Sequence, residues 1–222
     1  METLPALGRG LRHLNRYREA AGILVRHGLG DLLHMARLDH LIDEGLKGLM
    51  RRPPQLSEVS RPERVRLAIE ELGPTFIKAG QYLSTRSDLL PEEYLRELAK
   101  LQDAVPPFPA EEARRVIEEE LGGPVESFFA RFEGRALAAA SIAQIHAAQR
   151  LDGEKVVVKV ARPGLRRLVK ADLEIMGQLA AAVHRHLPDW RWRKPERIVA
   201  EIARSLDREM DFAIEAAHVE RF

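Results

Sequence analysis

The chain has 222 residues, a formal net charge of +1 and no cysteine. Its length allows one large domain or two small ones with a buried core, and its near-neutral charge argues against a protein that binds nucleic acid through bulk charge. The absence of cysteine excludes disulfides, thiolate zinc sites and a cysteine nucleophile, and no apolar run approaches the roughly 18 residues that a membrane-spanning helix needs.

The N-terminal region, residues 1–52, is predicted to be helical. Apolar residues recur through it at intervals of three and four, and Gly28-Leu29-Gly30-Asp31 indicates a break followed by the N-cap of a second helix. Arg9, Arg12 and Arg16 form a basic stripe on the first helix. The stripe is either a solvated helix face or a surface that contacts anionic lipid. The second alternative would place a cytoplasmic protein at the inner face of the cell membrane.

Residues 53–125 form a second predicted helical region. It begins with a linker, in which Ser60 is placed to cap the next helix and Glu63 falls at the third helical position. Gly73-Pro74 then redirects the chain, and Gly122-Gly123 ends the region's last helix. The expected helices are 60–72, 74–87, 91–103 and 110–121, with an extended proline-rich link at 105–109.

Residues 126–222 change from helical periodicity to strand periodicity and back. Asp152-Gly153 is a hairpin signal between the last two of three antiparallel strands. The expected strands are 128–138, 142–151 and 155–160, and the expected helices are 164–187 and 195–222. This order gives an α+β fold. Because the last helical pattern reaches Phe222 without a cap or a breaker, we expect the chain to be the front part of a longer protein.

The run from Val156 to Val160 contains Lys159 and is typical of a well-buried strand. Val158 and Val160 face one side of this strand, and Val157 and Lys159 face the other. A buried ammonium group without a negative partner costs several kcal/mol. We therefore expect Lys159 to meet an anion such as a nucleotide phosphate. The alternative is an edge lysine, or one whose stem alone is buried.

A turn of small residues, Ala138-Ala139-Ala140-Ser141, lies between the first two predicted strands. Small side chains let backbone N–H groups approach an anion closely. A strand lysine follows about 20 residues later, which is the order of a kinase phosphate-binding hairpin. Alanine in place of glycine makes the turn stiffer. The alternative is a plain alanine-rich turn or the start of a helix.

Acidic residues gather on the last predicted helix. Asp207, Asp211 and Glu215 are four residues apart, with Glu209 beside them. Nearby arginines could neutralise these acids on a solvated helix face. Alternatively, Glu215 pairs with Lys159 and supplies the negative partner that the strand lysine needs.

Lys78-Ala79-Gly80-Gln81 lies in the expected helix 74–87. Lys78 and Gln81 are three residues apart and share a helix face. Apolar neighbours predict that this helix is buried, so both polar side chains need partners elsewhere in the fold. The alternative is a surface lysine beside a glycine that serves helix packing.

Together, these motifs resemble the UbiB (AarF-type) atypical kinase family. The segment from Leu72 to Gln81 resembles its K-x-G-Q signature, and Ala138 to His146 resembles its alanine-rich loop, although Ala143 stands where the family commonly has glycine. Val156 to Val160 resembles its lysine strand. Glu209-Met210-Asp211 and Glu215-Ala216 resemble its E-x-D motif and the glutamate that pairs with the lysine. The similarity runs from about residue 10 to the end of the chain.

The resemblance implies a protein-kinase-like small lobe with an all-helical N-terminal extension, and a large lobe beyond residue 222. Residues 1–52 would be a helical and membrane-facing region, 53–125 the K-x-G-Q extension, and 126–222 part of the small lobe. ATP and Mg²⁺ are the implied cofactors. The catalytic loop and the metal ligands are expected beyond Phe222, so the chain itself would hold no metal and would be inactive alone.

The resemblance also implies roles for individual residues. Lys159 would hold the α- and β-phosphates of ATP, and Glu215 would orient Lys159. The turn of Ala138, Ala139, Ala140 and Ser141 would cover the phosphates. The K-x-G-Q helix would restrict access to the site, with Lys78 and Gln81 meeting Glu209 and Asp211.

The implied function is that of an ATP-binding half of an atypical kinase or ATPase that supports ubiquinone or other isoprenoid-lipid biosynthesis. Besides ATP, the expected partners are anionic membrane lipid, isoprenoid lipid and quinone-biosynthesis proteins, and nucleic acid is not expected. The alternative is a non-catalytic, pseudokinase-like scaffold that docks on a membrane or on a biosynthetic complex. The sequence that follows Phe222 in the gene distinguishes the two.

Overall fold

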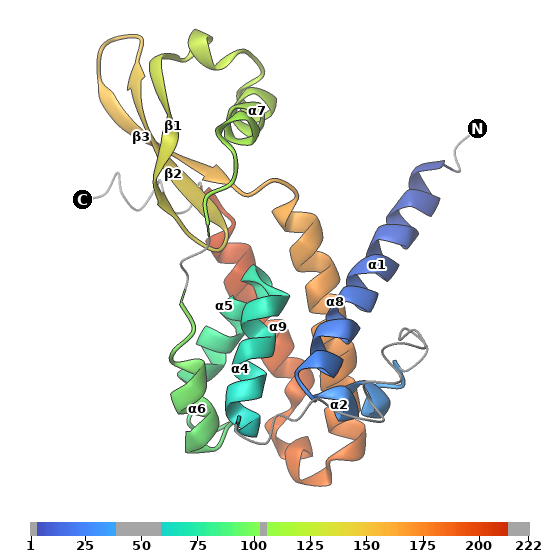
Figure 1. Cartoon of the computed structure of the whole chain (residues 1–222). Helices are drawn as coiled ribbons and strands as arrows, with labels where there is room; N and C mark the ends of the chain where they lie inside the picture. The colour runs from blue at the N-terminus through green and yellow to red at the C-terminus, as the bar shows by residue number, and fades with distance from the viewer. Residues whose placement is uncertain (1–3, 39–58, 103–105, 213–222) are drawn as a thin grey trace. The chain divides into compact units, whose positions relative to one another are not determined.

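The computed structural model describes residues 4–38, 59–102 and 106–212 (Figure 1). Its contacts divide the chain into two compact units. The first, which we call the helical unit, comprises residues 1–101 and 168–207, and the second, the sheet unit, comprises residues 102–167 and 208–222. The helix at 110–121 is thereby grouped with the strands, whereas the predicted boundary before the small lobe was placed at residue 126.

The sheet unit contains the predicted antiparallel meander. Its strands, in the order β1-β2-β3, are β1 (Phe129–Ala139), β2 (Ala143–Arg150) and β3 (Lys155–Ala161). The hairpin between β2 and β3 has Gly153 at a φ of 90°, and the Glu154 amide donates to Asp152 Oδ1 at 3.1 Å. Glycine adopts this left-handed region at little cost, so the Asp-Gly signal is confirmed.

Helix α7 (Ala110–Leu121) packs on one face of this sheet. Ala113 and Ile117 of the helix meet Val160 in a buried cluster, with Val158 packed against it. Gly122 ends the helix at a φ of 76°, as predicted for a C-terminal glycine. Val158 and Val160 therefore share the α7 face of β3.

The prediction that β3 is well buried is wrong for most of its length. Val160 is its one buried residue, and Val157 is 65% exposed. Within the described part of the chain β3 is an edge strand, because the strand order places it last. Its β-branched residues fit the pleated strand geometry, but α7 covers only one of its faces.

The helical unit is built from α1 (Leu4–Arg26), α2 (Gly30–Met35), α4 (Arg61–Leu72), α5 (Pro74–Ser84), α6 (Glu92–Leu98), and most of α8 (Leu165–His186) and α9 (Pro195–Glu209). A short 3₁₀ helix, η3 (Pro188–Arg193), joins α8 to α9, and another, η2 (Val125–Ser127), precedes β1 in the sheet unit. The break at Gly28 is confirmed, but the N-cap of α2 is Leu29 without a side-chain bond. The predicted helix beyond residue 38 and most of the 53–60 linker lie outside the described residues.

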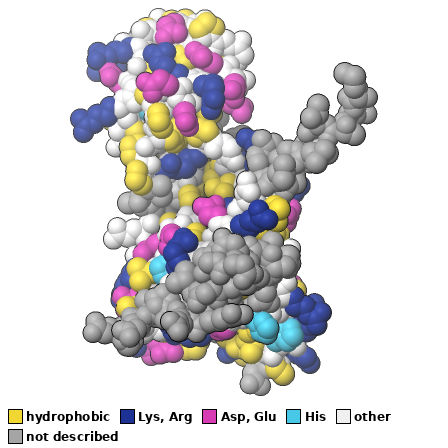
Figure 2. Space-filling view, turned by 45° about the vertical axis from the view of Figure 1, so that its right-hand side comes forward, with side chains coloured by type: hydrophobic (Ala, Val, Ile, Leu, Met, Phe, Trp, Pro, Cys, Tyr) yellow, Lys and Arg dark blue, Asp and Glu magenta, His cyan; other side chains and the backbone are white. Residues whose placement is uncertain are grey.

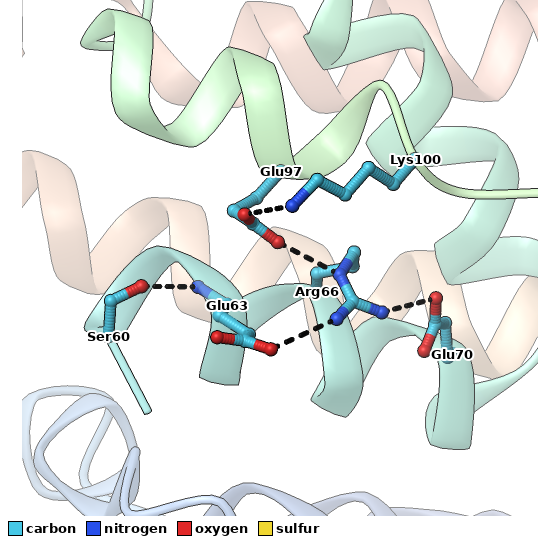
Figure 3. Close-up of polar contacts among 6 residues, drawn as sticks. All are labelled: Ser60, Glu63, Arg66, Glu70, Glu97 and Lys100. Carbon is cyan, nitrogen blue, oxygen red and sulfur yellow. Dashed lines mark hydrogen bonds and ion pairs between the residues drawn. The ribbon is translucent and has the colours of Figure 1, made fainter. Parts of the chain in front are cut away.

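Helix α4 begins as its sequence predicts, and a charged network ties it to α6 (Figure 3). The Glu63 amide donates to Ser60 Oγ at 3.3 Å, so Ser60 is the N-cap. Further along α4, Arg66 bonds Glu70 at 2.8 Å and Glu97 of α6 at 3.0 Å. Lys100 also contacts Glu97, and the Arg66–Glu97 bond is the contact of this network that joins α4 to α6.

The expectation that Arg16 belongs to an exposed basic stripe is wrong. Its side chain is 11% exposed, and its Nε donates to Asp172 Oδ1 of α8 at 2.7 Å. It also donates to the Leu72 carbonyl oxygen at the end of α4. Arg16 therefore joins three helices inside the helical unit, and its side chain is largely withdrawn from solvent. The side chains of Arg9 and Arg12 lie outside the described residues.

The last predicted helix, 195–222, is interrupted after Glu209, and its residues 213–222 lie outside the described residues. Helix α9 ends at Glu209, and the Asp211 amide donates to the Arg208 carbonyl at 3.3 Å in a tighter turn. Asp207 and Asp211 therefore do not share one helix face, which corrects the four-residue pattern. Met210 lies buried in this turn.

Helices α5 and α6 also end earlier than predicted, at Ser84 and Leu98. In the described ranges, no helix is both long enough and apolar enough to cross a membrane. Lys, Arg, Asp and Glu side chains are interspersed on the face shown in Figure 2. That mixture agrees with the near-zero net charge.

Candidate nucleotide-binding site

The sheet register places the alanine-rich turn and the strand lysine at the same end of the sheet. Ala138 of β1 is opposite Ile145 of β2, and Ile145 is opposite Lys159 of β3. Residues directly opposite one another in antiparallel strands point to the same face. Two strand spacings separate Ala138 from Lys159, or about 10 Å, which the side chain of a lysine and a bound phosphate can bridge.

Lys159 is half-buried and lines a cavity of about 360 Å³ in the sheet unit. Its ammonium group lies 4.6 Å from the centroid of the Phe212 ring. Asp211 and, from α7, Glu120 line the same cavity. The face of an aromatic ring attracts a cation without neutralising its charge. Lys159 therefore has an aromatic ring and a cavity as neighbours.

The sheet face that carries Lys159 offers an apolar surface beside it. Val157 is two residues earlier on β3 and 65% exposed, and it is opposite Ala147 of β2. Ile145 and Ala147 on this face are half-buried. A flat apolar surface next to a cation suits a ligand that has an aromatic base at one end and phosphates at the other.

The predicted turn of residues 138–141 is wrong in its first half, because Ala138 and Ala139 are the last residues of β1. The observed turn, at residues 140–142, contains a buried hydroxyl group without a partner among the described residues. Ser141 is fully buried, and its Oγ atom has no hydrogen-bond partner in the described part of the chain. The Ala140 amide donates to the Ala143 carbonyl at 2.8 Å, which closes the turn. An unsatisfied buried polar atom is costly, so a polar group of a ligand would be stabilised here.

Arg162, which the sequence reasoning did not identify, holds this turn. Its Nε donates to the Ala140 carbonyl at 3.1 Å, and its backbone amide donates to the Ile142 carbonyl at 3.0 Å. Its Nη2 also donates to the Pro106 carbonyl at 2.7 Å. Burial lowers the pKa of Arg162. Its position directly after β3, before Pro163-Gly164, was a local signal that could have identified it.

The orientation of a peptide group explains what Arg162 does. A carbonyl and the amide of the next residue point in opposite directions across a trans peptide bond. Because Arg162 binds the Ala140 and Ile142 carbonyls, the amides of Ser141 and Ala143 point away from it. The turn therefore has a fixed amide orientation rather than a freely rotating one.

The buried Gln144 of β2 fastens the 106–108 link to the same sheet, and the buried His146 holds the Gln144 side chain in place. Gln144 Oε1 accepts from the Phe108 amide at 3.0 Å, and its Nε2 lies 2.8 Å from His146 Nε2. His146 Nδ1 lies 2.8 Å from the Glu133 carbonyl, so Nδ1 is the protonated nitrogen and Nε2 accepts from Gln144. Arg162 stacks over the Phe108 ring, 5.5 Å from its centroid. The link, the turn and β2 thus form one hydrogen-bonded unit.

The other predicted site residues lie elsewhere or outside the described residues. Glu215 lies outside them, so its pairing with Lys159 stays a prediction. Glu209 is the last residue of α9, and Asp211 lines the lysine cavity. In α5, Lys78 is half-buried, and Gln81 Nε2 donates to the Leu101 carbonyl at 3.2 Å. Their pairing with Glu209 and Asp211 also stays a prediction.

The glycine of the K-x-G-Q motif has a packing role. A Cβ atom at Gly80 would lie 2.4 Å from Leu101 Cδ1 and 3.4 Å from Ile69 Cγ2. The absence of a side chain lets α5 approach these residues closely. The alternative of a helix-packing glycine is thus confirmed, and it does not exclude a further role for the motif.

The described residues fit the nucleotide better than the metal. They supply a cation, an oriented turn and an apolar face, which are groups that a nucleotide would need. They contain no group of three or more His, Cys, Asp or Glu that could hold a metal ion. We therefore assign no step to Mg²⁺.

Comparison with known proteins gives relatives over most of the chain. The ABC1 atypical kinase-like domain matches residues 100–222. The chain is 46% identical over 161 residues to "Probable protein kinase UbiB" of Marinobacter nauticus, covering 72% of this chain and 29% of that protein. The proteins of that name in Pseudomonas fluorescens and Aliivibrio fischeri are 44% and 39% identical, covering 88% and 92% of this chain and 37% and 38% of theirs.

A solved structure is also similar. It is that of Rv3197 from Mycobacterium tuberculosis in complex with erythromycin, with 28% sequence identity and a TM-score of 0.44, covering 79% of this chain and 42% of that one. The chain spans well under half the length of these relatives. The domain match nevertheless covers more than half of the chain, and the chain therefore belongs to the UbiB-type, ABC1 atypical kinase-like family.

Proposed function

We propose that this chain forms the ATP-binding half of an atypical kinase or ATPase that supports ubiquinone or other isoprenoid-lipid biosynthesis. The observation that carries the proposal is the row formed by Ala138, Ile145 and Lys159 across the sheet. It brings the small-residue turn and the strand lysine to one end of one face. Membership of the kinase-like family supports the same assignment.

In the proposed complex, Lys159 binds the α- and β-phosphates of ATP. Its position beside a cavity supports this role, because an ammonium group interacts strongly with phosphate where water is partly excluded. The amides of Ser141 and Ala143, directed away from Arg162, donate to phosphate oxygens. Arg162 is a positioning residue in this arrangement, since it acts through the turn.

The base of ATP would lie on the apolar face beside the lysine. Val157 is the exposed residue on that face, and covering it with a purine would remove apolar surface from water. When bound, Mg²⁺ neutralises charge on the phosphates. Glu215 would orient Lys159 by an ion pair, as the family resemblance implies.

We also propose that the K-x-G-Q helix restricts the access of substrates to the nucleotide site. Lys78 and Gln81 of the K-x-G-Q helix would pair with Glu209 and Asp211, and α5 would then limit entry of bulky substrates. The position of Asp211 at the lysine cavity supports a role for the E-x-D motif near the nucleotide.

Nucleotide titration of a lysine variant tests the proposal. Lys159→Met should weaken ATP binding by at least tenfold, because a charge-assisted bond to phosphate contributes roughly 1.5–3 kcal/mol. It should also abolish ATP turnover in the longer protein that carries this chain. Lys155→Met is the matched control, since Lys155 is an exposed lysine on the same face of β3, opposite Gln149.

Equal ATP binding by wild type and by Lys159→Met would contradict the proposal. That result would favour the second candidate, a pseudokinase-like scaffold in which Lys159 has a structural role. The contact between Lys159 and Phe212 would then be the observation that supports this structural role. Circular dichroism of both variants would establish that each remains folded.

A further inference from the structure

The segment that joins α8 to α9 combines aromatic and basic residues. Residues 184–197, which we call the aromatic–basic loop, contain both tryptophans of the chain, Trp190 and Trp192. They also contain five Arg or Lys residues against two acidic residues. The chain as a whole has a net charge of +1, so positive charge is concentrated in this loop.

Internal contacts hold the loop in a defined shape. The Arg193 guanidinium lies between the two tryptophans, 4.6 Å from each ring centroid. Arg191 Nε donates to the His184 carbonyl at 3.0 Å and so caps the C-terminus of α8. Two of the five cations therefore build the loop rather than face a partner.

This shape leaves large apolar side chains in water. Trp192 is 66% exposed and Leu187 is 38% exposed. Arginine stacking stabilises the tryptophan rings but leaves most of Trp192 uncovered. An exposed tryptophan costs solvation free energy, so its fixed exposure on an ordered loop indicates a binding surface.

The remaining cations of the loop flank these apolar residues in the chain. Arg185, Lys194 and Arg197 are exposed, and in the described ranges none of them forms an ion pair. Within the loop, the structure describes one contact between a histidine and a carboxylate, with 3.3 Å between His184 Nδ1 and Glu196 Oε2. Three exposed cations and an exposed indole in one short segment complement an anionic surface that also accepts apolar groups.

We propose that the aromatic–basic loop docks the chain on an anionic lipid surface. Tryptophan favours the interface between lipid head groups and hydrocarbon, and Lys and Arg are attracted to anionic head groups. An acidic peptide would use the cations but would leave Trp192 in water. The inference is independent of the proposed ATP chemistry. It also assigns lipid contact to a different part of the chain from the predicted stripe on α1.

Intrinsic fluorescence tests this directly, because the only two tryptophans of the chain lie in the loop. Vesicles of phosphatidylglycerol and phosphatidylcholine in equal parts should shift the emission of the full chain to shorter wavelength. Pure phosphatidylcholine vesicles should not. Co-sedimentation with the same vesicles gives the affinity, which should fall as salt is raised.

Loop variants should weaken that affinity in a defined order. Arg185→Gln, Lys194→Gln and Arg197→Gln together should cost roughly a hundredfold, at about 1 kcal/mol per charge. Trp192→Ala should cost about tenfold, from loss of buried apolar area. Leu137→Ala and Arg135→Gln are matched controls, since they remove a 63% exposed leucine and an exposed arginine of β1, and they should bind as wild type does.

Two results would overturn the inference. One is binding to anionic vesicles that the loop variants leave unchanged. The other is an emission shift with an oligoglutamate peptide but not with vesicles, which would assign the loop to an acidic protein partner. ATP titration of the same variants should match wild type, so failure here is distinguishable from failure of the proposed ATP site.

Discussion

Arg16 and Arg162 show two ways in which this chain stabilises a buried or half-buried arginine. Arg16 meets the carboxylate of Asp172, which is itself fully buried. Arg162 meets two backbone carbonyls and an aromatic ring instead. An ion pair neutralises the charge, whereas carbonyl contacts leave it in place. Arg162 can therefore contribute positive potential at the turn, while Arg16 serves only the packing of the helical unit.

The Arg16–Asp172 pair leads to a stability prediction. Burial raises the pKa of Asp172, and the hydrogen bonds and charge of Arg16 oppose that rise. Removing one partner leaves the other buried and unpaired, so Asp172→Asn or Arg16→Gln should each lower the free energy of unfolding by about 3–5 kcal/mol. The double variant Arg16→Met/Asp172→Leu should lose less than the sum of the two. Urea unfolding of the three variants measures this.

An exposed pair between α1 and α4 is the control for that cycle. Arg26 and Glu71 form an ion pair whose side chains are 49% and 43% exposed. Arg26→Gln should cost no more than about 1 kcal/mol, because water screens an exposed pair. If Asp172→Asn cost as little as Arg26→Gln, the buried pair would have no structural role.

At the scale of elements, two helical glycines give opposite predictions. Gly80 lies in α5 against Leu101, which is 5% exposed in a cluster with Ile77 and Leu98. Gly177 lies inside α8, and an added Cβ there would meet nothing within 4 Å. Gly80→Ala should lower the free energy of unfolding by about 1–2 kcal/mol, since Leu101 must leave its packed position. Gly177→Ala should raise it by up to about 1 kcal/mol, since alanine restricts the unfolded chain.

Chemical denaturation of the two alanine variants checks this pair. Each serves as the control for the other, because the substitution is the same and only the space around it differs. A gain in stability for Gly80→Ala equal to that of Gly177→Ala would show that Leu101 moves at no cost. That result would contradict the packing role that we assign to the K-x-G-Q glycine.

Elements bounded by local signals were predictable from the sequence. Ser60, Gly122 and the Asp152-Gly153 turn each act on neighbours a few residues away, and α4, α7 and the β2–β3 hairpin have close to the expected bounds. The placement of the alanine-rich segment and Lys159 at one end of the sheet was likewise predictable. In a three-stranded meander, the lengths of the strands determine which residues lie opposite one another.

Features that depend on distant partners were not predictable. Arg16 looked like a member of a surface stripe, and its partner Asp172 is 156 residues away. The end of α9 carries no proline or glycine, so helical spacing extended past Glu209 without contradiction. Arg162 owes its role to carbonyls of residues 106 and 140, which only the folded sheet unit brings together.

At the scale of the whole molecule, we expect ATP binding and ATP turnover to depend on different parts of the protein. It spans between 29% and 38% of the UbiB relatives compared above. Kinases complete phosphoryl transfer with a catalytic loop and carboxylates that hold Mg²⁺. We assign neither to the described residues, which contain no group of three or more His, Cys, Asp or Glu that could hold a metal ion. The features that we assign to nucleotide binding, by contrast, lie within residues 138–162.

The 222-residue chain should therefore bind ATP without hydrolysing it. Calorimetric titration should give a saturable ATP isotherm for the wild-type chain, and one at least tenfold weaker for Lys159→Met, because a charge-assisted bond is lost. Phosphate release in the presence of Mg²⁺ should be the same for both, at the level of buffer. Release by the wild type above that of Lys159→Met would show that residues 1–222 already hold a complete catalytic site. A longer protein that includes the following segment should bind ATP with similar affinity and release phosphate, since Lys159 and the turn supply binding and the added segment supplies the chemistry.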